Sequence, residues 1–158
     1  MVNLIDGVAM SKHVEHLTIA FDFDGTLTDG SGGLDGPLNL RPDTDKLLRF
    51  LHNKKVSLVL WTCRDGDYLQ YALRFLLAND LLRLFCAIND NAPSLSFKTS
   101  RKIAADYYVD DLAFGWSWDK HKRWLPLVGT LEQEPFFNPK GLELPGFLCR
   151  EYLESLIL

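Results

Sequence analysis

Two carboxylates, Asp22 and Asp24, come directly after the apolar run at residues 17–21. A glycine and Thr26 come next. Because side chains of an extended strand alternate between its faces, we expect Asp22 and Asp24 to point to the same side. Like charges at such short range repel unless a cation or a shared proton compensates. One carboxylate could attack an electrophile, the other could transfer a proton, and a hard cation could bind both. An ordinary Asp-Gly turn is the alternative for this pair taken alone.

Two further apolar runs end in polar side chains. The run at residues 56–61 is typical of a buried strand in a parallel sheet and leads into Thr62. A shorter run at residues 106–110 ends in the adjacent acids Asp110 and Asp111. Ligands of open α/β sheets bind beyond the carboxyl ends of the strands. The acids and the hydroxyl are therefore predicted to meet at one edge of a sheet.

The hydrophobic pattern predicts an alternation of strands and helices. Strands are expected at 17–23, 56–61, 84–88 and 106–110, and helices at about 42–53 and 66–79. This order indicates a doubly wound α/β fold with a central parallel sheet. We expect the strand at 17–23 to lie between those at 56–61 and 106–110. The Gly- and Asp-rich segment at 24–41 predicts a flexible flap beside the site.

The same residues resemble the four motifs of the haloacid dehalogenase (HAD) superfamily. In order, the motifs are DFDGT at 22–26, Thr62, a lysine at 102 or 98, and Asp110-Asp111. The stretches LWTCRDG and RKIAADYYVDDLAFG and the strand end at 87–89 resemble small capless HAD proteins of bacteria and phages. The resemblance covers about residues 17–115 and implies a Rossmannoid three-layer fold. The intervals between the motifs leave no room for a cap domain.

The resemblance also implies roles for these residues. Asp22 would attack phosphorus and form an aspartyl-phosphate, while Asp24 would protonate the leaving oxygen and later activate water. Mg²⁺ would be bound by the Asp22 side chain, the Asp24 backbone carbonyl and Asp110. Asp111 would be a further ligand or support one through water. Thr62 would hold a phosphate oxygen through its hydroxyl and the next backbone N–H.

A lysine would offset the charge on the phosphoryl group and on Asp22. Lys102 is the favoured candidate because it matches the narrower group, and Lys98 is the alternative. Additional contacts to the substrate are predicted for residues near the strand ends, namely Gly25, Thr26, Cys63, Arg64, Tyr68, Asn89 and Lys98. For Arg64, Tyr68 and Asn89, capping or packing is the competing interpretation.

Composition limits the possible functions. The chain has 158 residues, which fits a single domain, and its net charge of −4 gives no support to general nucleic-acid binding. Its three cysteines lack paired spacing, which indicates reduced thiols in the cytoplasm. A cysteine phosphatase is not favoured, because the arginine that such a signature requires is replaced by Leu69. We expect no secretory signal and no membrane-spanning segment.

The two ends of the chain carry less information. Residues 1–16 are expected to form an N-terminal lead, and residues 116–158 an aromatic-rich extension that packs on the core, with a final helix at about 147–157. The basic cluster at 120–123, flanked by Trp118 and Trp124, could bind nucleic acid. A solvated face whose aromatic side chains pack inward is the favoured interpretation. The oligomeric state is left open by the sequence.

The leading functional hypothesis is a Mg²⁺-dependent phosphomonoesterase that acts on a small phosphorylated metabolite or nucleotide. A 3′-phosphatase acting on nucleic-acid ends is a second possibility, although the acidic balance argues against it. A non-catalytic binding or regulatory module that keeps the fold is a third.

Overall fold

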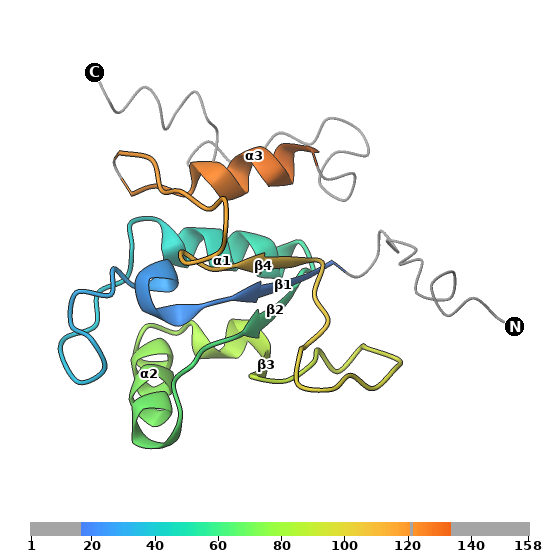
Figure 1. Cartoon of the computed structure of the whole chain (residues 1–158), viewed down its shortest axis with the longest axis horizontal. Coiled ribbons are helices and arrows are strands. Elements are labelled where there is room, and N and C mark those ends of the chain that lie inside the picture. The colour runs from blue at the N-terminus through green and yellow to red at the C-terminus, as the bar shows by residue number, and fades with distance from the viewer. Residues whose placement is uncertain (1–16, 121, 134–158) are drawn as a thin grey trace, which may run out of the picture.

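The computed structural model describes residues 17–120 and 122–133, which form a parallel four-stranded sheet with strand order β3-β2-β1-β4 (Figure 1). The strands are β1 (Thr18–Phe21), β2 (Ser57–Leu60), β3 (Phe85–Ile88) and β4 (Tyr107–Val109). The helices are α1 (Thr44–Asn53), α2 (Gly66–Ala78) and α3 (Leu125–Gln133), with a short 3₁₀ turn η3 (Leu82–Leu84) before β3. The predicted α/β fold with a parallel sheet is confirmed, and no cap domain is present among the described residues.

Strand β1 lies between β2 and β4, as the sequence predicts. Phe21, its last residue, is level with Leu60 of β2 and Val109 of β4. The residues that follow these three strands therefore leave the sheet at the same edge. This register brings together segments that are far apart in the sequence.

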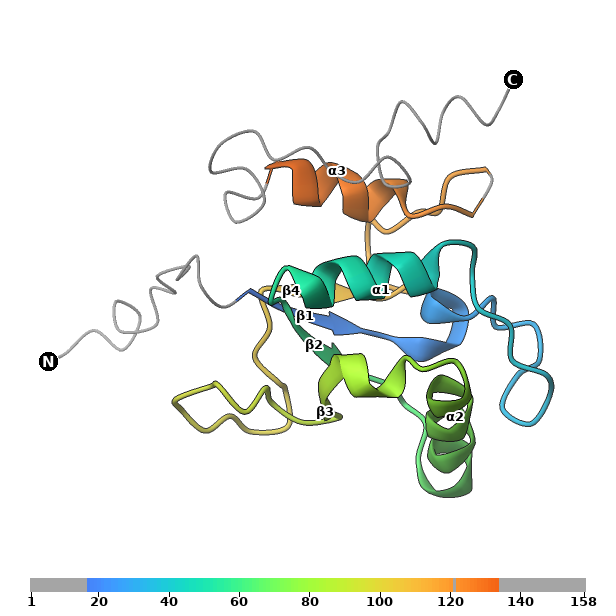
Figure 2. The same ribbon diagram turned by 180° about the vertical axis from the view of Figure 1, so that it is seen from behind.

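The main hydrophobic core lies on the face of the sheet covered by α1, which crosses in front of the strands in Figure 2. Ile19 and Phe21 of β1 are fully buried there, as are leucines of β2. Helix α1 forms because its leucines recur at helical spacing and make one apolar face. That face buries Leu47, Leu48 and Leu51.

The opposite face of the sheet has a smaller core. Ala20 and Val59 pack there with Ala92 and Ile103. The covering residues come from the irregular segment between β3 and β4, so this layer contains no regular helix.

A tight turn and a long loop follow β1. Residues Phe23–Leu27 form a π-helical turn (η2), inside which Asp24 and Gly25 leave helical geometry. An antiparallel bridge between Thr28 and Leu40 then closes the loop at residues 29–39, which we call the flap. The segment predicted to form a flap, residues 24–41, thus contains most of this turn and the bridged loop, and its flexibility stays a prediction.

The aromatic residues before α3 pack into the main core. Trp124 is 2% exposed, and its ring meets Phe21 edge-on with a centroid distance of 6.1 Å. Trp118 packs against Trp124 at 4.8 Å. The inward packing of these aromatics is confirmed, but Arg123 is not a solvated charge, because it is nearly buried and paired with Asp119.

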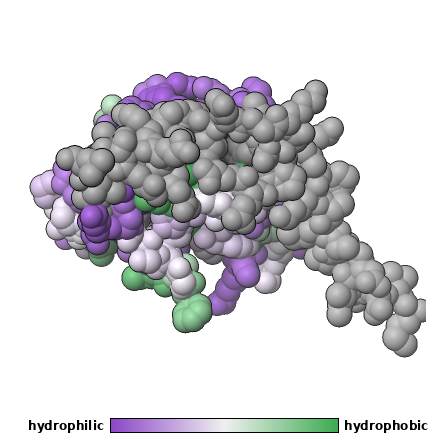
Figure 3. Space-filling model, turned by 90° about the horizontal axis from the view of Figure 1, so that it is seen from above, coloured by the Kyte–Doolittle hydropathy of each residue, from purple (hydrophilic) through white to green (hydrophobic). Residues whose placement is uncertain are grey.

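The predicted lead at 1–16, Cys149 and the helix at 147–157 lie outside the described residues. Within the described ranges, none of the helices is long and apolar enough to cross a membrane. Seen from above, the coloured surface is largely hydrophilic with a hydrophobic projection at its lower edge (Figure 3).

Candidate functional site

Three carboxylates meet at the edge of the sheet where β1 and β4 end. Asp22, Asp110 and Asp111 each offer an oxygen, and these oxygens lie within 4.8 Å of one another. The backbone N–H of Asp22 donates to the carbonyl of Val109 at 2.9 Å, which continues the β1–β4 pairing and sets Asp22 beside Asp110. The structure thus brings together three of the four residues predicted to bind a metal.

Thr26 holds two of these acids in place from inside the protein. Its hydroxyl accepts the backbone N–H of Asp111 at 3.0 Å. Its single proton can be donated to Asp22 Oδ2 at 3.1 Å or to Asp111 Oδ1 at 3.2 Å. Thr26 is fully buried. The predicted contact between Thr26 and a substrate is therefore wrong, because the side chain faces the carboxylates from below.

Gly25 lets Asp111 approach the turn closely. Its φ of 79° lies in the left-handed region, and a Cβ at this position would lie 2.5 Å from Asp111 Oδ2. The carbonyl of Gly25 accepts two hydrogen bonds from Arg41, through Nε at 3.0 Å and Nη2 at 2.7 Å. The structure gives Gly25 a role in shaping the site, and its predicted contact with a substrate stays a prediction.

The surroundings of Asp22 raise its pKa from the ordinary 3.8 to about 7. Burial is the largest cause, and repulsion by Asp110 and Asp111 adds to it. Hydrogen bonds from the Phe23 backbone and the Thr26 hydroxyl act in the opposite direction. A cation at the triad would favour the charged carboxylate, so metal binding and loss of this proton would go together.

The Asp24 carboxylate lies outside this triad. Its oxygens accept Arg64 Nε and Nη2, each at 2.8 Å. Strand alternation predicted that Asp22 and Asp24 would point the same way, and this is wrong. The chain leaves the β-strand after Phe21 and enters the π-helical turn, so the period-two rule no longer applies at Asp24. The implied contact of the Asp24 backbone carbonyl with a metal stays a prediction.

Arg64 is buried, with a side chain that is 1% exposed. Besides its two bonds to Asp24, it donates Nη1 to the carbonyls of Leu34 and Tyr68 and Nη2 to that of Gly33. All five N–H groups of the guanidinium are thereby occupied. The predicted contact between Arg64 and a substrate is wrong, because no donor is left for one.

Thr62 and Asn89 form the part of the site contributed by β2 and β3. The backbone N–H of Thr62 donates to Asn89 Oδ1 at 2.8 Å, and the backbone N–H of Arg64 donates to Thr62 Oγ1 at 3.1 Å. Within the described chain the Thr62 hydroxyl proton has no acceptor, so it could be donated to a phosphate oxygen. Asn89 fixes the end of β2, which supports its capping interpretation. Cys63 is exposed beside them.

Neither candidate lysine contacts the triad. Lys102 Nζ lies 5.3 Å from the ring centroid of Tyr108, and Lys98 is exposed. Among the described residues, neither lysine forms an ion pair with Asp22 or Asp110, so the predicted ion pair of Lys102 is wrong for this conformation. Which lysine acts at the site stays a prediction.

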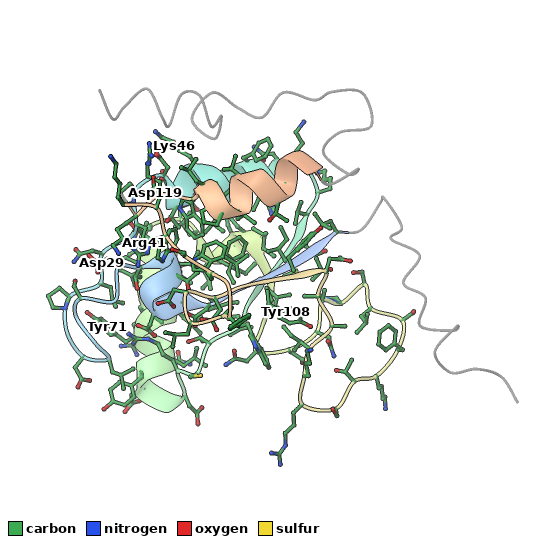
Figure 4. All side chains as sticks on the ribbon, turned by 45° about the horizontal axis from the view of Figure 1, so that its top comes forward. Asp29, Arg41, Lys46, Tyr71, Tyr108 and Asp119 are labelled. Carbon is green, nitrogen blue, oxygen red and sulfur yellow. The ribbon has the colours of Figure 1, made fainter. Side chains whose placement is uncertain are left out.

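Arg41 is a residue of the site that sequence reasoning missed. Its guanidinium carbon lies 4.3 Å from the centroid of the Trp118 ring, while its N–H groups bind the carbonyl of Gly25. Burial lowers the pKa of Arg41, and the charges of Asp111 and Asp29 oppose this. Figure 4 shows Arg41 and Asp29 close together beside the turn after β1. The arginine links the turn to the aromatic segment.

No protein-family model matches the chain, and no curated protein matches it either. Among solved structures, a conserved protein from Bacteroides thetaiotaomicron is similar, with 32% sequence identity and a TM-score of 0.55. The match covers 66% of this chain and 83% of that one. This chain belongs to the same family as that Bacteroides protein.

The type of ligand atom at the acidic triad indicates which metal ion this family member could bind. The triad of Asp22, Asp110 and Asp111 offers oxygen ligands alone. Hard cations such as Mg²⁺ prefer such ligands, whereas zinc sites usually include nitrogen or sulfur. The residues present therefore fit Mg²⁺.

Proposed function

We propose that the protein is a Mg²⁺-dependent phosphomonoester hydrolase of HAD type that acts through an aspartyl-phosphate. The meeting of Asp22, Asp110 and Asp111 within 4.8 Å is the observation that carries this proposal. The triad lies at the carboxyl ends of β1 and β4, where ligands of open α/β sheets bind. The order of the motifs in the sequence supports the same conclusion.

The residues divide the reaction into two displacements. An Asp22 oxygen forms a bond to phosphorus while the bond to the leaving oxygen breaks, and Asp24 gives that oxygen a proton. Water then attacks phosphorus, its proton passes to Asp24, and the bond to Asp22 breaks. Each Asp24 oxygen has a second lone pair, so its bonds to Arg64 leave room for proton exchange. Thr62 orients a phosphate oxygen. Bound Mg²⁺ supplies positive charge that offsets the acids and the phosphoryl oxygens.

The charges around the site favour a small substrate. Arg41 and Arg64 are occupied by protein carbonyls and, for Arg64, by Asp24. The Arg64 guanidinium, with all five N–H groups occupied, is not left to bind an extended phosphate backbone, and the net charge of −4 also supports a metabolite or nucleotide over a nucleic-acid end. Cys63 and Cys86 are free thiols, which fits a cytoplasmic location.

A panel of phosphorylated metabolites and nucleotides, assayed with Mg²⁺ and with EDTA, tests the proposal. A 3′-phosphorylated oligonucleotide in the same panel tests the nucleic-acid alternative. Asp22→Asn should abolish turnover and the covalent phosphoenzyme seen by mass spectrometry. Asp45→Asn, which changes an exposed acid on α1, serves as the matched control and should retain activity. Unchanged turnover in Asp22→Asn would refute the nucleophile, and inactivity on every phosphoester would favour a non-catalytic module.

A further inference from the structure

We infer that Arg64 is a positioning residue that couples the flap to Asp24. One buried guanidinium binds both the Asp24 carboxylate and two backbone carbonyls near the tip of the flap, those of Gly33 and Leu34. It also binds the carbonyl of Tyr68 in the first turns of α2. Arg64 therefore joins the turn after β1, the flap and α2 at a single point. Its consequence for catalysis rests on the proposed function, but the coupling itself does not.

The energetics of a buried guanidinium make the two contacts depend on each other. Hydrogen bonds to charged groups are worth about 1.5–3 kcal/mol each, and a buried charge that loses its partners is strongly disfavoured. When the flap lifts, Arg64 loses the acceptors of Gly33 and Leu34, and its hold on Asp24 weakens. By reciprocity, a change at Asp24 must alter the stability of the closed flap by the same amount.

Hydrogen bonds within the flap hold its backbone carbonyls in fixed positions relative to one another. The backbone N–H of Gly36 donates to the carbonyl of Gly32 at 2.8 Å, which closes a tight turn. A Cβ at Gly32 would lie 2.1 Å from the carbonyl oxygen of Pro37, so this approach requires glycine. Tyr71 of α2 adds a bond from its hydroxyl to the carbonyl of Gly36 at 3.1 Å, and its position is labelled in Figure 4.

The two attachments of the flap differ in what they control. The Tyr71 bond holds the flap to α2 without involving any carboxylate. The Arg64 bonds hold the flap and fix Asp24 together. Loss of the Tyr71 hydroxyl should therefore reach Asp24 only indirectly, through a looser flap, whereas loss of Arg64 removes the contacts with the flap and with Asp24 directly. This difference separates a positioning role for Arg64 from simple support of a loop.

Hydrogen–deuterium exchange at the flap amides tests the coupling without any substrate. The readout is the protection of the Gly33 and Gly36 amides, which donate to carbonyls within the flap. Arg64→Gln should raise their exchange about 10–100-fold, the equivalent of one or two charged hydrogen bonds. Asp24→Asn should raise it in the same direction, although its carboxylate has no hydrogen bond to the flap among the described residues.

One control variant and one check of the fold accompany this test. Arg49→Lys changes an exposed arginine that also contacts a carboxylate and a carbonyl, those of Asp80 and Asn79, and should leave flap exchange unchanged. Circular dichroism of each variant checks that the fold is retained, and Arg64→Lys provides a milder change if Arg64→Gln unfolds. Flap exchange in Asp24→Asn equal to that of the wild type would overturn the coupling.

Kinetics test the consequence for catalysis once a substrate is found. Arg64→Lys keeps a positive charge for Asp24 but cannot reach all five acceptors, so kcat should fall about 10–100-fold while KM changes little. Tyr71→Phe should lower kcat less than Arg64→Lys does, because the bonds between Arg64 and Asp24 are retained. Added guanidinium should partly restore kcat in an Arg64→Ala variant. A change in KM alone would indicate substrate binding by Arg64 and refute the positioning role.

Failure of the wild type to hydrolyse any phosphoester would refute the proposed function and leave the exchange result to decide the coupling.

Discussion

Removing the negative charge of Asp22 should stabilise the metal-free protein at pH 8. The rise in the pKa of Asp22 from 3.8 to about 7 means that the native state holds this proton where the unfolded chain has lost it. The stability linked to Asp22 is therefore fully present below pH 3.8 and is lost as the pH rises through about 7. Asp22→Asn has no proton to lose, so its stability should not fall in this way as the pH rises. The amide keeps an oxygen that can accept a hydrogen bond from the Thr26 hydroxyl.

The expected gain follows from the size of the pKa change. A rise from 3.8 to about 7 has an upper limit of about 4 kcal/mol, at about 1.4 kcal/mol per tenfold change in proton affinity. Because Asp22 is only half-buried, solvent screening lowers this, and we expect about 1–2 kcal/mol. For a domain of this length, that gain corresponds to a Tm about 2–8 °C higher.

Urea unfolding in EDTA, followed from pH 4 to pH 8, measures this effect as the difference between Asp22→Asn and the wild type. The difference should grow as the pH rises and should shrink or reverse when Mg²⁺ replaces EDTA. Asp80→Asn is a control of opposite sign, because Arg83 and Arg49 lower the pKa of that exposed carboxylate to about 2. The contribution of Asp80 is present above pH 3.8 and lost as the pH falls through about 2. Equal stability of Asp22→Asn and wild type at pH 8 in EDTA would refute the argument.

Three further substitutions have defined expectations, each measured by urea unfolding. Gly25→Ala should lower the free energy of unfolding by about 1–3 kcal/mol, because its Cβ would displace Asp111. It should also weaken Mg²⁺ binding, measured by calorimetry, and unchanged stability would contradict the close approach of Asp111 to Gly25. Thr26→Val keeps the shape but leaves the Asp111 N–H unsatisfied, and should cost about 1–3 kcal/mol; no loss would mean that the bridge to Asp22 and Asp111 is unimportant. Trp124→Ala should cost about 3–5 kcal/mol through a core cavity; a loss below 1 kcal/mol would show that the aromatic segment is not part of the core.

The sheet and the acidic triad could be predicted because they depend on short patterns. Apolar runs that end in carboxylates indicate buried strands with a site beyond them, and the parallel register then brings Asp22 level with Asp110. The element boundaries were predicted one or two residues too wide at most strands. Strand ends are set by hydrogen bonds to neighbouring strands, which single-sequence patterns do not contain.

The contacts of Asp24, Arg64 and Arg41 could not be predicted in the same way. The period-two rule fails at Asp24 because a π-helical turn begins at Phe23, and no local pattern marks it. Both arginines bind backbone carbonyls, and every residue has a carbonyl, so the sequence cannot show which one is chosen. The glycines in the flap were the available signal, since they indicated that the backbone approaches another group closely.

Strand β4 is the last strand in the sequence but pairs with the first, β1, and this order matters while the chain is being synthesised. β1 gains one neighbour, β2, early in synthesis, but its other edge stays open until Tyr107–Val109 emerge. An open inner strand can pair with a foreign chain, so a nascent or truncated polypeptide lacking β4 should be prone to aggregation. The same delay means that Asp22 has no acidic neighbours from β4 during this interval. The acidic triad and the four-stranded sheet are therefore completed together, when β4 pairs with β1.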